Sequence, residues 1–471
     1  MVPMNMRATD YITPELLARY DKPGPRYTSY PTALEFHEGV DETDYRQRLA
    51  RLPQGSETVS IYVHIPFCKS RCHFCGCHTA LCRDTSEMDR YVDDLCTEIA
   101  LIQNQLQDPM PLSAVHFGGG TPTYLPDAQM GRIFEKLHRT FDVQPSAEVS
   151  IEVNPAVTSV AQVSFLSSLG FNRISLGVQD FDERVLKAIG RRQTNAQTLG
   201  IIDAARATGF GSVNMDLIYG LPGQTRTGFD NTLKQVCAVR PDRIALYSFA
   251  WIPWIRENQK QIIESDIPSR DDKFAFFAAA MNRFMQNGYL QIGMDHFALK
   301  TDELARAASE GTLFRNFMGY TVIKSKNSIG LGVSAIGYLD GAFFQNEKAN
   351  DAYGQLVQKG ALPICKGLVL SDDDLIRASV ITELMCNFKV DIPEFEKKWQ
   401  IRFDSYFSEE MAMLAAQRDD ARQGHELAFT EADEPLMLTD VGRLFVRNVC
   451  MLFDRYLKDK VESRPLFSRT V

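Results

Sequence analysis

Short β-branched segments alternate with helix-length segments from residue 58 to about residue 250. Strands are expected at Val59–His64, Ala114–Phe117, Glu148–Val153, Arg173–Gly177, Ser212–Ile218 and Arg243–Phe249. Helix-length stretches lie between several of them, at Glu87–Leu106, Ala128–Phe141 and Ala196–Thr208. Successive β–α units of this kind predict a parallel sheet with helices outside it. The apolar runs indicate strands that are covered on both faces.

Chemically distinctive residues stand at or just beyond the end of every predicted strand. A cysteine cluster follows the first strand and a run of three glycines follows the second, while a polar side chain closes each of the others: Glu152, Gln179, Asp216 and Tyr247. In α/β barrels the chemistry collects at the carboxyl ends of the strands, whereas a doubly wound sheet confines its site to one switch point. Contributions from all six strands to one rim therefore predict a partial (βα)6 barrel.

The segments on either side of this alternation differ from it. The sequence DKPGPRYTSYPT lies in residues 1–57, and its prolines forbid continuous helical hydrogen bonding, so we predict an irregular N-terminal arm. We assign residues 58–369 to the barrel domain with an extension, and residues 370–471 to a mostly helical, winged-helix-like C-terminal domain. Its expected elements are a helix opening at Ser371, a second around Tyr406–Ala416, a hairpin of Leu427–Thr430 with Leu436–Leu438, and a final helix over Thr439–Tyr456.

Composition restricts the partners and the compartment. The 471 residues are 44% apolar, and 51 Lys and Arg against 60 Asp and Glu give a net charge of −9. Without a global basic field, nucleic acid is not an expected partner. We expect no membrane span, because no stretch approaches the ~20 apolar residues that one needs. The N-terminus lacks the apolar core of a signal peptide, so we expect a cytoplasmic protein with reduced thiols.

Four of the ten cysteines crowd into one short segment, IYVHIPFCKSRCHFCGCHT. Cys68, Cys72 and Cys75 have a C-x3-C-x2-C spacing, and Cys77 follows two residues later. Soft thiolates in a reducing compartment select zinc or an iron–sulfur cluster. Structural zinc sites use paired C-x2-C knuckles separated by a longer stretch, and the second knuckle is missing here. The spacing therefore favours three corners of a cubane cluster, with the fourth iron open to a ligand, over zinc.

These motifs resemble the radical S-adenosylmethionine (SAM) superfamily and, within it, the oxygen-independent coproporphyrinogen III oxidase family. The resemblance runs nearly from end to end and includes KPGPRYTSYPT, YVHIPFC with the extra Cys77, FGGGTPTYL, SIEVNP, GVQDF, NMDLIYGLPGQT, GMDHFA, GVSAIG and RNVCMLFDRYL. It implies a radical SAM barrel with a 4Fe–4S cluster on Cys68, Cys72 and Cys75, and not on Cys77. It also implies an oxidoreductase of anaerobic heme biosynthesis, which converts two propionates of coproporphyrinogen III to the vinyl groups of protoporphyrinogen IX.

The resemblance further implies a SAM site and places residues in it. These are Tyr62, Phe74, Cys77, Gly118, Gly119, Gly120, Thr121, Glu152, Gln179, Arg191 and Asp216. Two SAM molecules are implied, with Ile336 near the second, and we assign Glu152 a catalytic role as well. Taken singly, these residues have simpler structural interpretations: Phe74 shields a cluster, Tyr62 packs in a strand, and a run of glycines marks a turn.

The implied substrate is a tetrapyrrole with four carboxylates, so Lys22 and Arg26 in the arm are candidate anchors by charge alone. An unidentified reducing electron donor and an electron acceptor are also implied, and we expect a monomer. Two positions differ from the family pattern: Trp251 replaces a histidine, and Met318 replaces a glutamine whose amide donors and acceptor methionine cannot supply. These differences keep open a radical SAM paralogue that transfers methyl to heme or opens its ring. A heme chaperone shares the cysteine signature, but the arm and Cys77 favour the enzyme.

Overall fold

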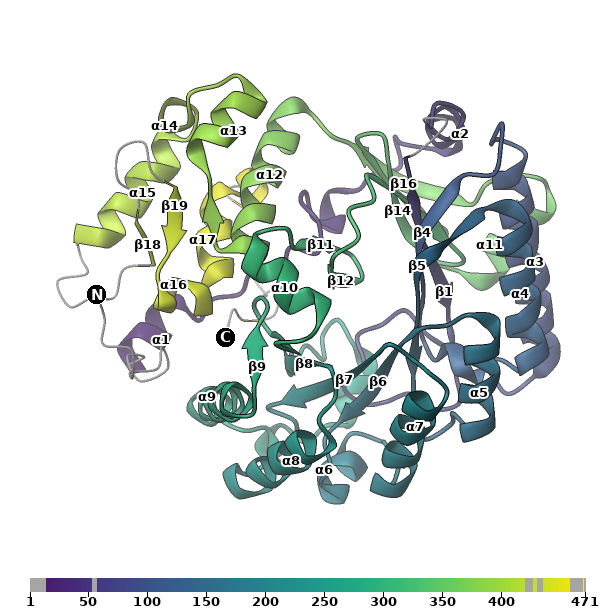
Figure 1. Cartoon of the computed structure of the whole chain (residues 1–471), viewed down its shortest axis with the longest axis horizontal. Coiled ribbons are helices and arrows are strands. Elements are labelled where there is room, and N and C mark those ends of the chain that lie inside the picture. The colour runs from purple at the N-terminus through teal and green to yellow at the C-terminus, as the bar shows by residue number, and fades with distance from the viewer. Residues whose placement is uncertain (1–13, 53–56, 420–426, 430–434, 458–468, 470–471) are drawn as a thin grey trace.

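The computed structural model of this chain describes residues 14–52, 57–419, 427–429, 435–457 and 469. A sheet of 12 strands runs through the middle of the molecule (Figure 1). Its central strands are parallel neighbours in chain order: β1 (Val59–Ile65), β4 (Pro111–Gly119), β5 (Asp142–Val153), β6 (Arg173–Gln179), β7 (Ser212–Tyr219) and β8 (Arg243–Ser248). They match the predicted strands, and the partial (βα)6 barrel is confirmed.

Helices connect these strands along the outer side of the sheet. They are α3 (Thr85–Gln103), α4 (Asp127–Thr140), α5 (Val160–Leu169), α6 (Glu183–Ala188), α7 (Asn195–Ala207) and α8 (Arg226–Val239). Helices α5, α7 and α8 begin after Ser159, Thr194 and Thr225, whose hydroxyls accept a hydrogen bond from the first helical turn. Such caps fix where each helix starts and hence how long the preceding loop at the rim can be.

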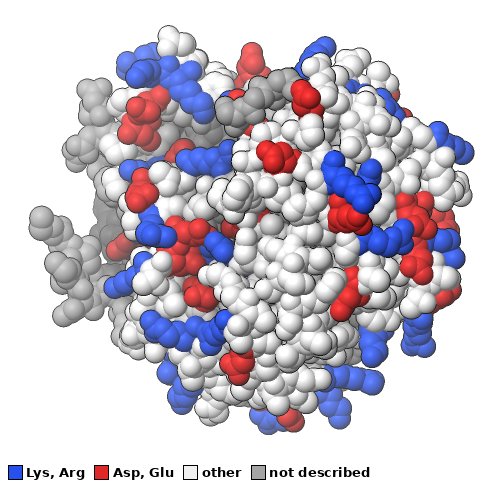
Figure 2. All heavy atoms as spheres, turned by 45° about the vertical axis from the view of Figure 1, so that its right-hand side comes forward, with Lys and Arg blue, Asp and Glu red and all other residues white. Residues whose placement is uncertain are grey.

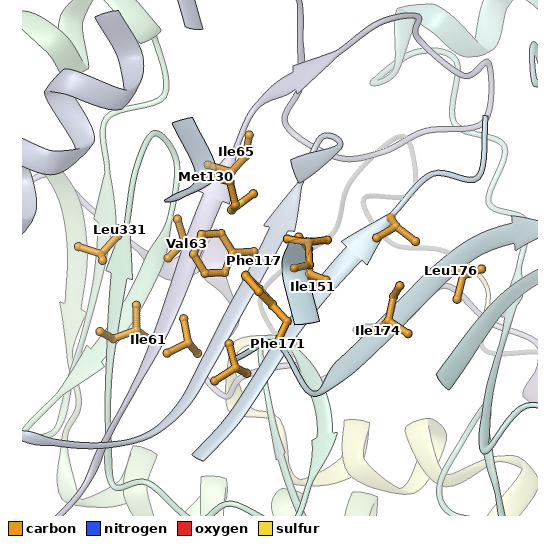
Figure 3. Packing of buried hydrophobic residues seen from close by; sticks show 14 of the residues in the cluster. Ile61, Val63, Ile65, Phe117, Met130, Ile151, Phe171, Ile174, Leu176 and Leu331 are labelled. Atoms are coloured by element: carbon orange, nitrogen blue, oxygen red, sulfur yellow. The ribbon is translucent and has the colours of Figure 1, made fainter. Parts of the chain in front are cut away.

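Side chains on the parallel strands alternate between two different environments. On β1, Ile61, Val63 and Ile65 are fully buried against the helices. Figure 3 shows Val63, Phe117 and Ile151 packed side by side across neighbouring strands. The opposite side carries polar residues and encloses a cavity. The expectation of apolar strands covered on both faces is therefore wrong for the inner face, because that face lines the interior of the barrel.

Further strands extend the sheet at both edges, so it does not close. Parallel β13 (Asn327–Leu331) joins β1, and it is followed by antiparallel β14 (Ile336–Leu339), β15 (Ala342–Asn346) and β16 (Ile364–Val369). Beyond β8 lie β10 (His296–Leu299) and β9 (Tyr289–Gln291). The extension also contains α9 (Arg270–Gln286), α10 (Glu303–Glu310), α11 (Asn350–Gln358) and the two-stranded sheet of β11 (Phe314–Asn316) with β12 (Gly319–Thr321).

The N-terminal segment is only partly irregular. Residues 21–32 contain no helix, as predicted from their prolines, but α1 (Pro14–Tyr20) precedes them and α2 (Glu42–Ala50) follows. A capping box at Asp41 fixes the start of α2, where the Asp41 carboxylate accepts from the amides of Thr43 and Asp44. The expectation of an irregular segment through Thr32 missed α1, because the prolines constrain only the residues around them, while α2 lies beyond that segment.

The C-terminal part is mostly helical, as predicted. Its helices are α12 (Asp372–Asn387), α13 (Ile392–Trp399), α14 (Phe403–Tyr406), α15 (Ser408–Asp419), α16 (Asp440–Leu444) and α17 (Val446–Phe453). Ser371 caps α12 as expected, and β18 (Ala428–Phe429) pairs with β19 (Leu436–Leu438), while β17 (Lys389–Val390) completes a small sheet. Thr430, the end of the predicted hairpin strand, lies outside the described residues. The expected final helix is interrupted at Phe445.

The arm and the C-terminal part share one hydrophobic core. Leu17, Tyr20 and Tyr27 of the arm pack with Phe445 and other residues of α12–α17. The Tyr27 hydroxyl donates a hydrogen bond of 2.9 Å to Asp454, and Arg447 donates to the carbonyl of Pro25 at 2.9 Å. These contacts fix the arm between the C-terminal part and the barrel.

The molecular surface carries both signs of charge. On the face drawn in Figure 2, Lys and Arg side chains are interspersed with Asp and Glu side chains. Within the described ranges, none of the helices is long and apolar enough to cross a membrane.

Candidate cofactor site

The three predicted cluster ligands lie on one loop at the carboxyl end of β1. Two short parallel strands close this loop, β2 (Phe67–Cys68) and β3 (Ala80–Leu81). Cys68, Cys72 and Cys75 are partly exposed, and the Cys68 sulfur lies 3.5 Å from the hydroxyl oxygen of Thr121. Cys77 is exposed, and its amide donates to the Cys75 sulfur at 3.4 Å. The loop therefore carries three partly exposed thiols, of which Cys68 lies against Thr121 in the segment that follows β4.

The cysteine loop is held from behind by a segment that the sequence analysis did not single out. Asn258 and Gln259 lie on the short 3-10 helix η4 (Glu257–Gln261) and are buried. The Asn258 side-chain nitrogen lies 3.0 Å from the carbonyl oxygens of Cys72, His73 and Cys75. Gln259 donates to the carbonyl of Phe74 at 3.2 Å. In the sequence, Asn258 and Gln259 are only two amide residues between two aromatic-rich stretches. No spacing around them indicates that they contact the cysteine loop.

The glycine run after β4 is required by close contacts. A Cβ at Gly118 would lie 3.1 Å from both the Glu152 carboxylate and the Tyr62 ring. At Gly119 the backbone has a φ of +111°, and a Cβ would lie 2.6 Å from the His64 ring. At Gly120 it would lie 2.5 Å from the carbonyl oxygen of Pro66. Only glycine accommodates these approaches, so the run brings the β4 backbone against the start of the cysteine loop.

Glu152 ends β5 inside the barrel and interacts with predicted site residues. One of its oxygens accepts the Gly119 amide at 3.2 Å, and the other lies 3.3 Å from His116 Nε2. Burial by itself would raise the pKa of this carboxyl, but the hydrogen bond from His116, its charge and the Gly119 amide lower it overall. Glu152 thus presents a carboxylate on the inner face, beside the glycine run.

Tyr62 lies next to Glu152 on the inner face of β1. Its hydroxyl is 3.0 Å from His64 Nδ1, and His64 Nε2 is 3.0 Å from the carbonyl oxygen of His78. Burial lowers the pKa of His64 to about 4, so this imidazole is neutral near pH 7. The chain of contacts links Tyr62 to the far end of the cysteine loop.

Gln179 and Arg191 converge above the end of β6. Gln179 has a φ of +71°, and a Cβ at Gly177 would lie 2.8 Å from its amide nitrogen and 3.0 Å from an Arg191 nitrogen. The Arg191 guanidinium lies 5.9 Å from the centroid of the Phe74 ring, and its buried Nε has no hydrogen-bond partner among the residues that the structure describes. Burial raises the pKa of the Cys72 thiol, and the charge of Arg191 opposes this rise. Arg191 therefore offers a cation with an unused donor beside the cysteine loop.

Asp216 lies on the inner face of β7 and lines a cavity of about 140 Å³ in the barrel. It accepts hydrogen bonds from Asn214 at 2.8 Å and from Ser175 at 3.2 Å. Burial and the charge of Glu152 raise its pKa to about 7. Glu152 and Asp216 are thus two carboxyls of one cavity with pKa values moved in opposite directions.

Ile336 begins β14 at a half-buried position. It lies beside Gly330 of β13, because a Cβ at Gly330 would come within 2.7 Å of the Ile336 carbonyl carbon. Gly330 in turn pairs with Tyr62 of β1. Ile336 is therefore one strand beyond the neighbour of Tyr62, at the same level of the sheet.

Of the two candidate substrate anchors, Lys22 is exposed and Arg26 is engaged within the protein. Arg26 forms an ion pair with Asp295, and its guanidinium lies 5.2 Å from the centroid of the Tyr247 ring. Asp295 also lies 2.7 Å from His296 Nδ1. Arg26 thus ties the arm to the barrel rim, a role that charge alone could not reveal.

The two residues that depart from the family pattern occupy different places. Met318 lines the barrel cavity together with Asp216 and His296. Trp251 follows β8 and lines a separate pocket, and its ring lies 6.4 Å from that of Trp254. Met318 and Trp251 therefore line two different pockets.

The donor set of the cysteine loop fits an iron–sulfur cluster with three protein ligands. The three thiols are soft ligands on one loop. The backbone of Gly120 lies against the start of this loop, and the Arg191 guanidinium lies close enough to act on the Cys72 thiol. Among the residues that the structure describes, no group of three His, Cys, Asp or Glu side chains is placed to hold a single metal ion.

Comparisons with known proteins agree with this arrangement. Residues 62–236 match the model of the radical SAM superfamily. The oxygen-independent coproporphyrinogen III oxidase of Escherichia coli is 41% identical over 97% of this chain and 98% of its own length. The enzyme of that name from Synechocystis is 38% identical over 97% of each chain. The solved structure of E. coli coproporphyrinogen III oxidase (HemN), described as a radical SAM enzyme, superposes with a TM-score of 0.87 at 40% identity, covering 92% of this chain and 97% of that one.

Proposed function

This chain belongs to the oxygen-independent coproporphyrinogen III oxidase family of radical SAM enzymes, and we propose that it converts two propionate side chains of coproporphyrinogen III to the vinyl groups of protoporphyrinogen IX. The observation that carries the proposal is the 41% identity to the E. coli enzyme over nearly the whole of both chains. The cysteine loop, the glycine run and the inner carboxyls are all present to support it.

The cofactors of this family are a 4Fe–4S cluster and SAM. We assign Cys68, Cys72 and Cys75 as the cluster ligands, because they are the three thiols of the loop that faces Thr121. When held by Cys68, Cys72 and Cys75, the cluster would supply the electron that cleaves SAM to methionine and a 5′-deoxyadenosyl radical, and this chemistry would take a hydrogen atom from the propionate carbon β to each carboxylate, with carbon dioxide and one electron lost to the acceptor. Cys77 is left as an exposed thiol beside Cys75 and is assigned to SAM contact.

The remaining residues of the site bind and orient SAM in this proposal. The carboxylate of Glu152 accepts hydrogen bonds from the SAM amino group, beside the backbone of Gly118, Gly119 and Gly120. Arg191 pairs with the SAM carboxylate through its guanidinium charge, and Gln179 flanks it. Asp216 interacts with ribose hydroxyls, and Tyr62, Phe74 and Thr121 line the approach. The low pKa of Glu152 and the raised pKa of Asp216 give one charged and one largely neutral carboxyl below pH 7.

A second SAM molecule is part of the proposal. Ile336 lies beside Gly330, the β-sheet partner of Tyr62, so a ligand over Ile336 would adjoin one over Tyr62. Equilibrium dialysis of the reconstituted protein with radiolabelled SAM tests this, and Ile336→Asp is expected to remove one of the two bound molecules.

We also propose a division of labour along the chain. Residues 1–57 form an arm over the active site, residues 58–369 the catalytic barrel, and residues 370–471 a domain that holds the arm through contacts such as Tyr27 with Asp454. An external reductant, an electron acceptor and a monomeric state belong to the proposal as well. Arg26 then acts by fixing the arm to Asp295, while Lys22 stays exposed as a candidate anchor.

Product analysis tests the proposed reaction. The reconstituted protein is incubated anaerobically with coproporphyrinogen III, SAM and a reductant, and the products are separated by mass spectrometry. We expect 5′-deoxyadenosine together with the divinyl product. The absence of both products would exclude the reaction. Heme serves as the comparison substrate, because Trp251 and Met318 differ from the family pattern, and SAM-dependent loss of its absorbance band would indicate a different tetrapyrrole reaction.

A further inference from the structure

A second pocket, with a volume of about 360 Å³, opens beyond the carboxyl end of β8. Its walls include the aromatic side chains Phe249, Trp251, Trp254 and Phe274. The remaining lining includes residues of the arm, of the segment that follows β8 and of the first turn of α9, together with Ile267 and Arg469. The barrel cavity measures about 140 Å³, so this pocket, which lies at the rim, is the larger of the two.

Cationic side chains stand among these aromatic rings. Lys273 and Arg270 of α9 line the pocket. The Lys273 ammonium donates to the carbonyl oxygen of Phe249 at 2.9 Å, which is an uncharged partner. The acidic Asp21 also lines the pocket, but Arg469 lies 3.2 Å from its carboxylate. Aromatic faces together with cations form a site for a flat apolar ring that carries carboxylates.

The protonation state of Lys273 suits this chemistry. Burial lowers its pKa to about 8, against the charge of Asp21, which raises it. The amine is therefore still mostly protonated near pH 7, and a carboxylate beside it would raise the Lys273 pKa back toward its usual value. The aliphatic part of Lys273 lies over Gly220, where a Cβ would come within 2.7 Å of its Cε. This packing fixes the direction of the side chain.

The pocket wall is connected to the cysteine loop. Gln259 donates to the carbonyl of Ala250 in the pocket wall at 3.0 Å and to the carbonyl of Phe74 in the cysteine loop at 3.2 Å. Phe74 and Trp251 also pack against one apolar cluster that includes Phe249. The pocket wall and the cysteine loop thus share Gln259 and one apolar cluster.

We propose that this pocket binds one carboxylate-bearing pyrrole edge of the tetrapyrrole substrate, with the ring against Trp251 and Trp254 and the propionate paired with Lys273 and Arg270. The inference rests on the proposed function and assigns the substrate a place at the rim. The pocket volume accommodates a part of such a macrocycle rather than the whole. The rest of the macrocycle extends toward the cysteine loop.

Binding of coproporphyrin III, the stable oxidised macrocycle with the same four carboxylates, tests the proposal. The chain has three tryptophans, of which Trp251 and Trp254 line the pocket and Trp399 lies on α13. In a Trp399→Phe holoenzyme, we expect the porphyrin to quench tryptophan fluorescence. Lys273→Gln should weaken binding by roughly tenfold or more, and Arg270→Gln, at an exposed arginine whose ion-pair partner is Asp271, by several-fold. Lys326→Gln, on a distant exposed lysine paired with Glu57, should bind as the parent does.

The outcomes separate this inference from the proposed function. Unchanged porphyrin affinity in both Lys273→Gln and Arg270→Gln overturns the pocket assignment, even if the parent protein forms the divinyl product. Porphyrin binding that shifts its absorbance band without tryptophan quenching overturns it as well. Weakened binding in both variants, with parental iron content and SAM binding, supports it. Failure of the parent protein to decarboxylate coproporphyrinogen III would instead count against the proposed function alone.

Discussion

The side-chain nitrogen of Asn258 lies 3.0 Å from the carbonyl oxygen of Cys72, although 186 residues separate them in the chain. The same nitrogen is 3.0 Å from the carbonyl of Cys75, so one amide holds the backbone at two proposed cluster ligands. Such a contact sets the positions of the thiols without touching iron, which is how residues around a metal site commonly act on it.

Asn258→Ala should destabilise the cluster while leaving its ligands in place. The change takes the Asn258 donor away from the partly buried carbonyl oxygens of His73 and Cys75, at a cost of about 1–3 kcal/mol. We expect the reconstituted variant to lose iron in air several-fold faster than the parent, as followed by the decay of cluster absorbance. Asn172→Ala is the control, because that asparagine bridges Ala147 and Val149 elsewhere in the sheet and should lower stability without affecting iron. Equal cluster lifetimes in Asn258→Ala and the parent would contradict this role.

Replacing the cysteines one at a time should divide them into two groups. Cys68→Ala, Cys72→Ala and Cys75→Ala each remove a proposed ligand, and we expect each to abolish the stable 4Fe–4S signal in electron paramagnetic resonance. Cys77→Ala should retain parental iron and sulfide, because Cys77 is exposed beside Cys75 and is not a proposed ligand. Loss of the cluster in Cys77→Ala alone would reverse the assignment.

A methyl group at Gly120 should prevent SAM binding. Its Cβ would lie 2.5 Å from the carbonyl oxygen of Pro66, so the backbone on either side must move. We expect Gly120→Ala to lower the melting temperature and to reduce SAM affinity by at least about tenfold, as measured by calorimetry. Gly200→Ala is the matched control. Gly200 lies in α7, and a Cβ there would have no atom of the described neighbouring residues within 4 Å. That variant should be neutral or more stable by up to about 1 kcal/mol.

Asp216 should make stability depend on pH. Its pKa is raised from 3.8 to about 7, so the folded protein keeps this proton over a range in which the unfolded chain has released it. The folded state therefore binds more protons in that range, and the free energy of unfolding falls as the pH rises through it. Asp216→Asn removes this contribution. Thermal unfolding of the cofactor-free protein between about pH 4 and about pH 8 should show a smaller loss of stability in the variant. Parallel curves for the two proteins would contradict the raised pKa.

The ion pair of Arg26 with Asp295 should hold the arm on the barrel. Arg26→Gln removes the ion-pair partner of the buried Asp295 carboxylate and leaves it the contact with His296 and the more distant charge of Arg315, and such a loss costs up to about 3–5 kcal/mol. We expect a lower denaturant midpoint and faster proteolysis within residues 14–32. Arg26→Gln combined with Asp295→Asn should recover part of the stability, because the unpaired charge is gone. An arm that resists protease equally in all three proteins would show that the C-terminal contacts alone retain it.

Local pattern determined much of this protein. The alternation of strands and helices predicted all six parallel strands of the barrel, because period and length are properties of neighbouring residues. The spacing of Cys68, Cys72 and Cys75 likewise indicated the type of cofactor, since three thiols on one short loop limit the chemistry available. The cap at Ser371 predicted the start of α12 for the same local reason.

Only the tertiary structure decided which distant residues meet. It placed the Asn258 amide behind the cysteine loop, used Arg26 on Asp295 rather than leaving it for a ligand, and set Trp251 beside Lys273 in one pocket. It also turned the polar side chains of the strands toward the inner face, where they line a cavity. Contacts between segments a hundred or more residues apart depend on how whole elements pack, and no short-range period in the sequence encodes them.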